Sequence, residues 1–245
     1  ANEVPKLIKD GSFIGIDGFV GIGVPEEILL NIEESYLKEG KPNSLNIIFA
    51  AGFGDSKTRG LNRIAHERMI KKVIGGHWGL APNLGNLANQ KKIEGYNLPQ
   101  GVIAQMFRDM AAGKPGTLSK VGIGTFVDPE LEGAKINSIT KEDIVLKLNI
   151  LGEEILFFKA PKLDIALLRG TTADEDGNIS YENEVLFLDG LHIATAAKNA
   201  GGKVIVQVEK LVKKESINPK LVKIPGILVD YVVLVEDMKN HMQTY

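Results

Sequence analysis

Apolar residues gather in short continuous runs along this chain, and most runs stop at a glycine. The runs cover residues 12–16, 45–51, 73–74, 163–168, 204–208 and 229–235, with a further candidate around Val121. Runs of this length are typical of strands that are buried on both faces, as they are in a parallel sheet. We therefore expect a sheet of mainly parallel strands.

Several of the segments between these runs show the spacing of apolar residues that is typical of a helix. Residues 25–40 begin with Pro25 and two glutamates, which suit the positive end of a helix dipole, and end at a glycine. Residues 102–110 and 194–200 carry similar apolar faces, and residues 61–69 show a weaker one. Residues 144–158 instead alternate on both sides of a central turn, which predicts an antiparallel hairpin.

These elements predict an α/β fold. We expect a mainly parallel open sheet with helices on both faces and a small antiparallel hairpin excursion. The chain contains no linker rich in proline or serine, so residues 1–245 are expected to form a single domain.

Composition narrows the functional classes. The net charge of −2 gives no reason to expect nucleic acid or an anionic membrane surface as a partner. The absence of cysteine excludes disulfides and thiolate chemistry and favours a cytoplasmic setting. No apolar run approaches the ~18 residues of a membrane span. The 27 glycines exceed the usual share, and they cluster beside the apolar runs.

Several standard motifs are absent. Gly18, Gly21 and Gly23 have the wrong order for a dinucleotide fingerprint, and no lysine lies in a Walker loop. No serine lies in the nucleophile elbow of α/β hydrolases. The four histidines are scattered and predict no metal site.

Four glycine-containing loops follow apolar runs, at residues 17–23, 52–55, 75–78 and 122–126. The carboxyl ends of parallel strands meet at one edge, so these loops are expected to converge on one crevice. Glycine lets backbone N–H groups approach an oxygen that gains negative charge. Gln100, between Pro99 and Gly101, could present its amide to a carboxylate or thioester oxygen. The alternatives are that the glycines are only turn residues and that Gln100 bonds its own backbone.

The order and spacing of several of these segments resemble those of a known family. Asp10-Gly11, a short apolar run, Gly18-Phe19 and then Gly23-Val24-Pro25 look like the first-half signature of the family I coenzyme A transferases. Two positions depart from it, because Gly15 replaces an apolar residue and Asp17 replaces a glycine. The stretches that resemble the single-chain acetate and propionate branch are residues 75–78, 99–101, 111–115, 122–129, 169–171 and 177–179.

The resemblance implies a ping-pong CoA-transferase acting on a short-chain acyl-CoA and a carboxylic acid. Coenzyme A is then a substrate, and no tightly bound cofactor is expected. A glutamate forms an acyl anhydride and then a glutamyl thioester. In the family this nucleophile lies in a Glu-Asn/Ser-Gly turn of the second half. Glu182-Asn183 imitates that turn, but Glu184 stands in place of the glycine, so Glu182 is better interpreted as a solvated loop carboxylate.

The chain is accordingly expected to be an α-type half that contains no nucleophile. Its expected partner is a second half or β subunit, in a higher oligomer such as a tetramer. The resemblance implies that Gln100 lies next to the substrate carboxyl group. The other residues expected to bind substrate are Gly18, Phe19, Gly21, Gly76, His77, Gly124, Thr125 and Phe126.

Three questions stay open at the level of sequence. Asp17 either narrows the acyl pocket or bonds the amides of its own loop. The chain could instead be a non-catalytic ligand-sensing domain of the sugar-phosphate-isomerase-like type, or a structural half with a vestigial pocket. The sequence does not identify the preferred acid, because one methylene group changes the binding free energy by only ~1–3 kcal/mol.

Overall fold

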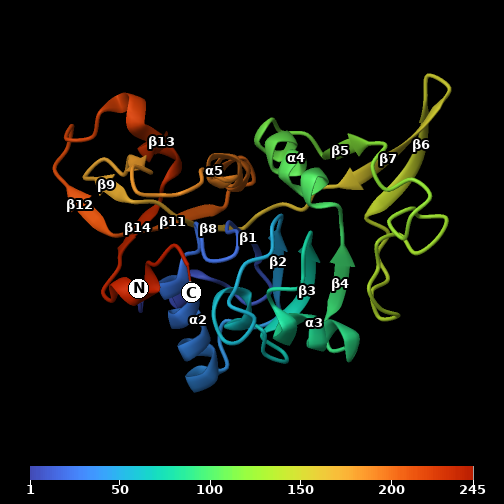
Figure 1. Cartoon of the computed structure of the whole chain (residues 1–245), viewed down its shortest axis with the longest axis horizontal. Helices are drawn as coiled ribbons and strands as arrows, with labels where there is room; N and C mark the ends of the chain where they lie inside the picture. Colours follow the sequence, from blue (N-terminus) through green and yellow to red (C-terminus); the bar gives the residue numbers. More distant parts are fainter. Residues whose placement is uncertain (245) are drawn as a thin grey trace.

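The apolar runs form the centre of a seven-stranded sheet in the computed structural model, which describes residues 1–244 (Figure 1). In spatial order its strands are β14 (Tyr231–Leu234), β11 (Lys203–Val208), β8 (Ile165–Arg169), β1 (Phe13–Ile16), β2 (Leu45–Phe49), β3 (Ile70–Gly75) and β4 (Glu94–Asn97). All six neighbouring pairs are parallel. The predicted parallel sheet is thus confirmed.

Helices cover both faces of this sheet. On one face lie α1 (Val4–Leu7), α2 (Glu26–Glu39) and α3 (Pro82–Asn89), and on the other lie α4 (Gln100–Ala111) and α5 (Gly190–Asn199). Side chains alternate between the two cores: Ile47 and Phe49 of β2 face the first helices, and Ile48 faces the second. Gly15 lets α5 pack onto β1, because a Cβ there would lie 2.9 Å from the side chain of Ile193.

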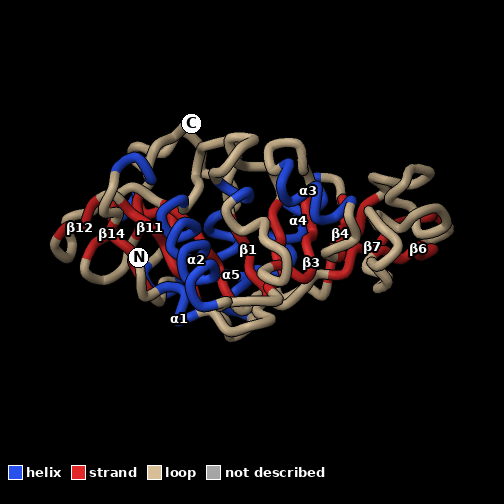
Figure 2. Tube along the Cα trace, turned by 90° about the horizontal axis from the view of Figure 1, so that it is seen from below, coloured by secondary structure: helices blue, strands red, loops and turns tan. Residues whose placement is uncertain are grey.

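Two smaller sheets lie at opposite ends of the elongated molecule (Figure 2). One is antiparallel, in the order β5 (Gly116–Ser119), β7 (Glu153–Lys159) and β6 (Val145–Ile150), and it contains the predicted hairpin. The sequence did not predict the other, whose order is β12 (Lys210–Val212), β9 (Thr172–Asp174), β10 (Ile179–Ser180) and β13 (Val222–Ile224). Short 3-10 helices cover Gly60–Asn62, Pro219–Leu221, Gly226–Leu228 and Met238–Asn240. No helix within residues 1–244 is long and apolar enough to cross a membrane.

Two predicted elements are wrong. Residues 61–69 form no α-helix; after the 3-10 helix Gly60–Asn62 the segment is irregular, and tertiary packing rather than helical repetition buries Leu61 and Met69. The parallel strand expected around Val121 is also absent. Strand β5 ends at Ser119, and the Val121 N–H donates to Ser119 Oγ, which leaves the Val121 side chain exposed.

The strand order creates a switch point between β1 and β8. From β1 the chain passes to α2 on one face, whereas from β8 it passes through β9 and β10 to α5 on the other face. Loops that leave neighbouring strands toward opposite faces open a crevice at the carboxyl edge, where ligands bind in open α/β sheets. The loop that follows β1 is the glycine-rich segment 17–23.

Candidate active site

The glycine-rich loop contains a tight hairpin. Phe19 and Ile22 exchange two backbone hydrogen bonds of 2.9 and 2.8 Å, and Val20 has a φ of 57°. A positive φ is a strained conformation for a β-branched residue, and such strain gathers at functional sites. A Cβ placed on Gly21 would lie 2.9 Å from Thr244 Cα, so glycine is needed where the C-terminal segment crosses the loop.

Most amides of this loop already have partners. The Gly18 N–H donates to Asp17 Oδ1, and the Val20 N–H donates to the Gly52 carbonyl. Only the amides of Gly21 and Gly23 donate to no acceptor among residues 1–244. The loop therefore offers fewer free donors than its glycine content suggested.

Three of the four predicted loops meet at the carboxyl edge. Gly18 packs on the Phe53 ring, since a Cβ there would lie 2.8 Å from it. A Cβ on Gly52 would come within 2.5 Å of His77, and one on Gly76 would come within 2.8 Å of Gln100 Cα. The segments after β1, β2, β3 and β4 therefore form one continuous surface.

Gln100 is the first residue of α4, and its side chain is exposed. That side chain makes no hydrogen bond to the described part of the chain, so it does not bond its own backbone. Two further polar atoms near this edge are buried without a partner among residues 1–244: Asn97 Oδ1 at the end of β4, and Trp78 Nε1. Sequence analysis missed Asn97, because the segment 94–97 is not an apolar run.

The fourth loop, residues 122–126, is linked to the end of β4 through the backbone of Ala134. Asp128 organises it by accepting the Gly124 N–H and pairing with Lys147 at 3.0 Å, and these contacts lower the pKa of Asp128. Phe126 accepts a backbone hydrogen bond from Ala134, whose carbonyl accepts the Asn97 N–H. Thr125 and Phe126 are exposed, and the loop follows an antiparallel strand instead of the expected parallel one.

Glu182 lies outside this edge, beside the four-stranded sheet. Its carboxylate accepts a 2.5 Å hydrogen bond from Thr172 Oγ1. Desolvation raises its pKa, but hydrogen bonds with Ser180 and Thr172 outweigh it and the net shift is downward. The side chain is exposed, as a loop carboxylate would be.

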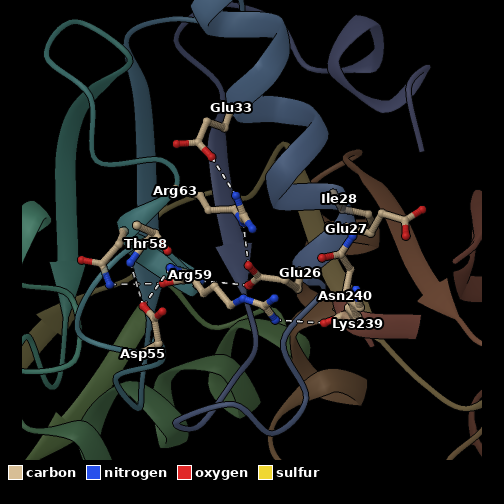
Figure 3. A network of polar contacts seen from close by, with 12 residues as sticks. Glu26, Glu27, Ile28, Glu33, Asp55, Thr58, Arg59, Arg63, Lys239 and Asn240 are labelled. Carbon is tan, nitrogen blue, oxygen red and sulfur yellow. Dashed lines mark hydrogen bonds and ion pairs between the residues drawn. The ribbon is translucent and has the colours of Figure 1, made fainter. Parts of the chain in front are cut away.

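The C-terminal segment 236–244 is tied to α2 and its surroundings by a polar network (Figure 3). The Glu27 carboxylate accepts the N–H groups of Glu236 and Asp237 at 3.0 to 3.1 Å. Arg59 donates to the Lys239 carbonyl. Glu26 binds Arg63 at 2.6 Å and so fixes the start of the helix from its other side.

Arg169 anchors the same segment at the end of β8. It is buried, pairs with the buried Glu184 at 3.0 Å, and donates to the carbonyls of His241 and Met242. His241 Nδ1 lies 3.0 Å from Gln207 Nε2, which can only donate, so Nε2 of the neutral ring carries the proton. The C-terminal segment thus lies against the end of β8 and against the glycine-rich loop that follows β1.

No group of three or more His, Asp or Glu side chains in residues 1–244 is placed so that it could hold a metal ion. A family model for coenzyme A transferase, in contrast, matches residues 1–235. The chain belongs to the coenzyme A transferase family. The resemblance noted in the sequence is therefore confirmed.

Sequence relatives agree with this assignment. The chain is 47% identical to caffeate CoA-transferase of Acetobacterium woodii over 244 residues, which are 100% of this chain and 47% of that protein. It is 43% identical to acetate CoA-transferase YdiF of Escherichia coli O157:H7, over 98% of this chain and 45% of that protein. The chain thus spans about half the length of these relatives. It also matches 93% of an acetoacetyl-CoA:acetate/butyrate CoA transferase alpha subunit of Clostridium acetobutylicum, at 28% identity.

Solved structures confirm the fold. The acyl-CoA transferase YdiF of E. coli O157:H7, in a thioester complex with CoA, superposes with a TM-score of 0.94 at 41% identity. That match covers 100% of this chain and 50% of the other. Glutaconate coenzyme A-transferase of Acidaminococcus fermentans shares the fold at 20% identity, with a TM-score of 0.75 over 99% of this chain and 76% of the other.

Proposed function

We propose that this chain is the acyl-binding half of a CoA-transferase. The enzyme would move CoA from a short-chain acyl-CoA to a carboxylic acid through a glutamyl thioester, with the glutamate supplied by a second half or β subunit. No tightly bound cofactor is required, because CoA is itself a substrate. The family assignment and the similarity to acetate and caffeate CoA-transferases support this proposal.

The observation that carries the proposal is the continuous edge from the glycine-rich loop to Gln100. Gly18, Gly52 and Gly76 bring the ends of β1, β2 and β3 into contact, and the last of these contacts Gln100. The Gln100 amide has no hydrogen-bond partner in residues 1–244, so it is free to bind a substrate oxygen. Gly124, Thr125 and Phe126 would form the outer wall of the same pocket.

Gln100→Ala tests the pocket. In the enzyme assembled from this chain and its second half, the variant should lower kcat/KM for the carboxylic acid by about tenfold to a hundredfold, as expected for losing a hydrogen bond to a charged group. Initial rates of transfer from acetyl-CoA or propionyl-CoA measure the effect. Gln90→Ala, at the exposed end of α3, is the matched control and should behave as the wild type.

Three outcomes would contradict the proposal. Equal transfer by Gln100→Ala and wild type would remove Gln100 from the pocket. Transfer by this chain alone, abolished by Glu182→Ala, would place the nucleophile in this half. A ligand-sensing role would be favoured if the assembled protein bound small anions but transferred no CoA.

A further inference from the structure

Asp17 occupies the switch point between β1 and β8, in the position where the family signature has glycine. Its carboxyl group accepts two backbone hydrogen bonds from segments far apart in the sequence. Oδ1 accepts the Gly18 N–H and Oδ2 accepts the Asp189 N–H, both at 3.1 Å. Asp189 directly precedes α5, so one side chain joins the glycine-rich loop to the helix on the far side of the crevice.

The start of α5 is shaped around this carboxyl group. A Cβ placed on Gly190 would lie 3.3 Å from Asp17 Oδ2 and 2.6 Å from the Tyr181 hydroxyl oxygen. Real Cβ atoms do not approach a neighbour as closely as the second distance. Glycine at position 190 therefore leaves room for the Tyr181 hydroxyl group, and it also allows the close approach of Asp17 to the start of α5.

The surroundings of Asp17 oppose its ionisation. Burial raises its pKa to about 8, and the carboxylate of Asp189 contributes to the rise, whereas the N–H donors of Gly18 and Asp189 lower it. The Tyr181 phenol faces Asp17 from the segment after β10.

Four other charged groups act on the neighbours of Asp17. Arg169 and Glu184 act on Tyr181, and His192 and Arg108 act on Asp189. Ionisation of Asp17 places its carboxylate beside that of Asp189, and the repulsion between the two charges opposes the contact between the loop and the start of α5.

We propose that Asp17 is a positioning residue, whose carboxyl group spans the switch-point crevice and sets the place of the Phe19–Ile22 hairpin at the acyl pocket. The inference rests on the proposed function for its catalytic consequence. The hairpin that this contact holds at one end contains Phe19, which is 40% exposed, and Val20, whose φ is strained. A glycine at position 17 could not make the contact.

Hydrogen exchange on the chain itself tests the anchor without any activity. Asp17→Asn keeps one acceptor oxygen and loses the other, and Gly190→Ala crowds both the Tyr181 hydroxyl group and the Asp17 carboxyl group without changing the charge of Asp17. In both variants the hydrogen-bonded amides of Gly18, Phe19, Val20 and Ile22 should exchange about tenfold faster than in the wild type. Gly85→Ala in α3, where a Cβ meets no atom within 4 Å, is the control and should leave them unchanged.

Wild-type protection of these four amides in Asp17→Asn would overturn the inference. That variant decides the question if Gly190→Ala fails to fold. Faster exchange throughout the chain in Asp17→Asn would also contradict it, because a positioning role is confined to the loop and the start of α5.

The assembled enzyme supplies a second readout. Wild-type kcat/KM for the acid should fall as the pH rises through about 8, while Asp17→Asn should start about tenfold lower and lack this step. Identical pH profiles would contradict the positioning role. An inactive wild-type assembly would instead contradict the proposed function, and the exchange result would still decide the role of Asp17.

Discussion

The buried side-chain amide of Gln207 links the start of α2 to the C-terminal segment. Its Oε1 accepts the N–H groups of Glu27 and Ile28, which begin α2, at 3.0 and 3.2 Å. Its Nε2 donates to the Asn240 carbonyl and to His241. The side chain thus caps a helix and fastens the C-terminal segment, and none of its hydrogen-bonding groups is left unused.

Gln207→Leu should therefore destabilise the protein markedly. The substitution leaves two backbone N–H groups, one carbonyl and His241 Nδ1 without their partner in a buried place, and we expect the free energy of unfolding to fall by about 3 kcal/mol. Urea denaturation measures the change. Gln90→Leu, at the exposed end of α3, controls for the loss of an amide and should change stability by less than about 0.5 kcal/mol. Equal effects of the two substitutions would show that the network around Gln207 contributes nothing.

The positions of the important glycines were predictable from the sequence, but the buried polar side chains were not. Glycine has a direct signature, because it interrupts apolar runs where the chain must turn. Gln207 and Arg169 lie within or at the end of apolar strands, and their partners are 15 to 180 residues away. Such pairs follow from the tertiary fold and leave no local pattern.

The hairpin of β6 and β7 gives the clearest test at the level of an element. Leu151 and Gly152 form its turn with φ angles of 55° and 84°, the combination that favours Asn-Gly in two-residue hairpins. The Leu151 side chain is 99% exposed, so its replacement removes no packing.

Leu151→Asn should stabilise the protein by about 1 kcal/mol, because asparagine tolerates the left-handed conformation better than leucine. Thermal denaturation should show a higher midpoint. Leu151→Ala keeps a Cβ at the same φ and should leave the midpoint nearly unchanged. A rise of equal size in both variants would assign the gain to removal of an exposed leucine.

Elements with strong local signals were predictable, and the others were not. The apolar runs 45–51 and 163–168 became β2 and β8, since buried strands need no partner pattern to be recognised. Strands β9, β10, β12 and β13 have only two or three residues each. Strands this short show no alternation of apolar and polar residues in the sequence. Their pairing depends on distant segments, which no local pattern reveals.

Protonation of His241 bears on the stability of the whole molecule. Burial and, to a smaller extent, the charge of Arg169 lower its pKa to about 3, so the folded protein holds the ring neutral. An unfolded chain binds this proton near the ordinary value of 6.5. The unfolded state therefore binds more protons between these values, and stability is lost as the pH falls from about 6.5 towards 3.

His241→Asn should reduce this acid sensitivity by a few kcal/mol, since the asparagine oxygen can still accept from Gln207 but cannot titrate. The free energy of unfolding, measured by urea at a series of pH values from 7 to 4, gives the comparison. The exposed His77 provides the control variant His77→Asn, which should follow the wild-type curve. Parallel curves for wild type and His241→Asn would contradict the assignment.

The convergence of the loops was predictable in outline, because the carboxyl ends of parallel strands meet at one edge and the glycine loops mark strand ends. The contact of residues 241–244 with this edge was not predictable. It depends on Arg169 and Gly21, which are 72 and 223 residues from their respective contacts.

The place of β1 in the sheet also constrains the order of folding. Ile14 pairs with Ile47 on one side and with Ile165 on the other, so one edge of β1 can close early and the other must wait for a segment 151 residues later. During synthesis, β1 to β4 can assemble while that second edge still exposes unpaired backbone groups. An edge of this kind is prone to pair with other chains. Ribosome-bound chains that stop before residue 165 should therefore be the most aggregation-prone intermediates of this fold.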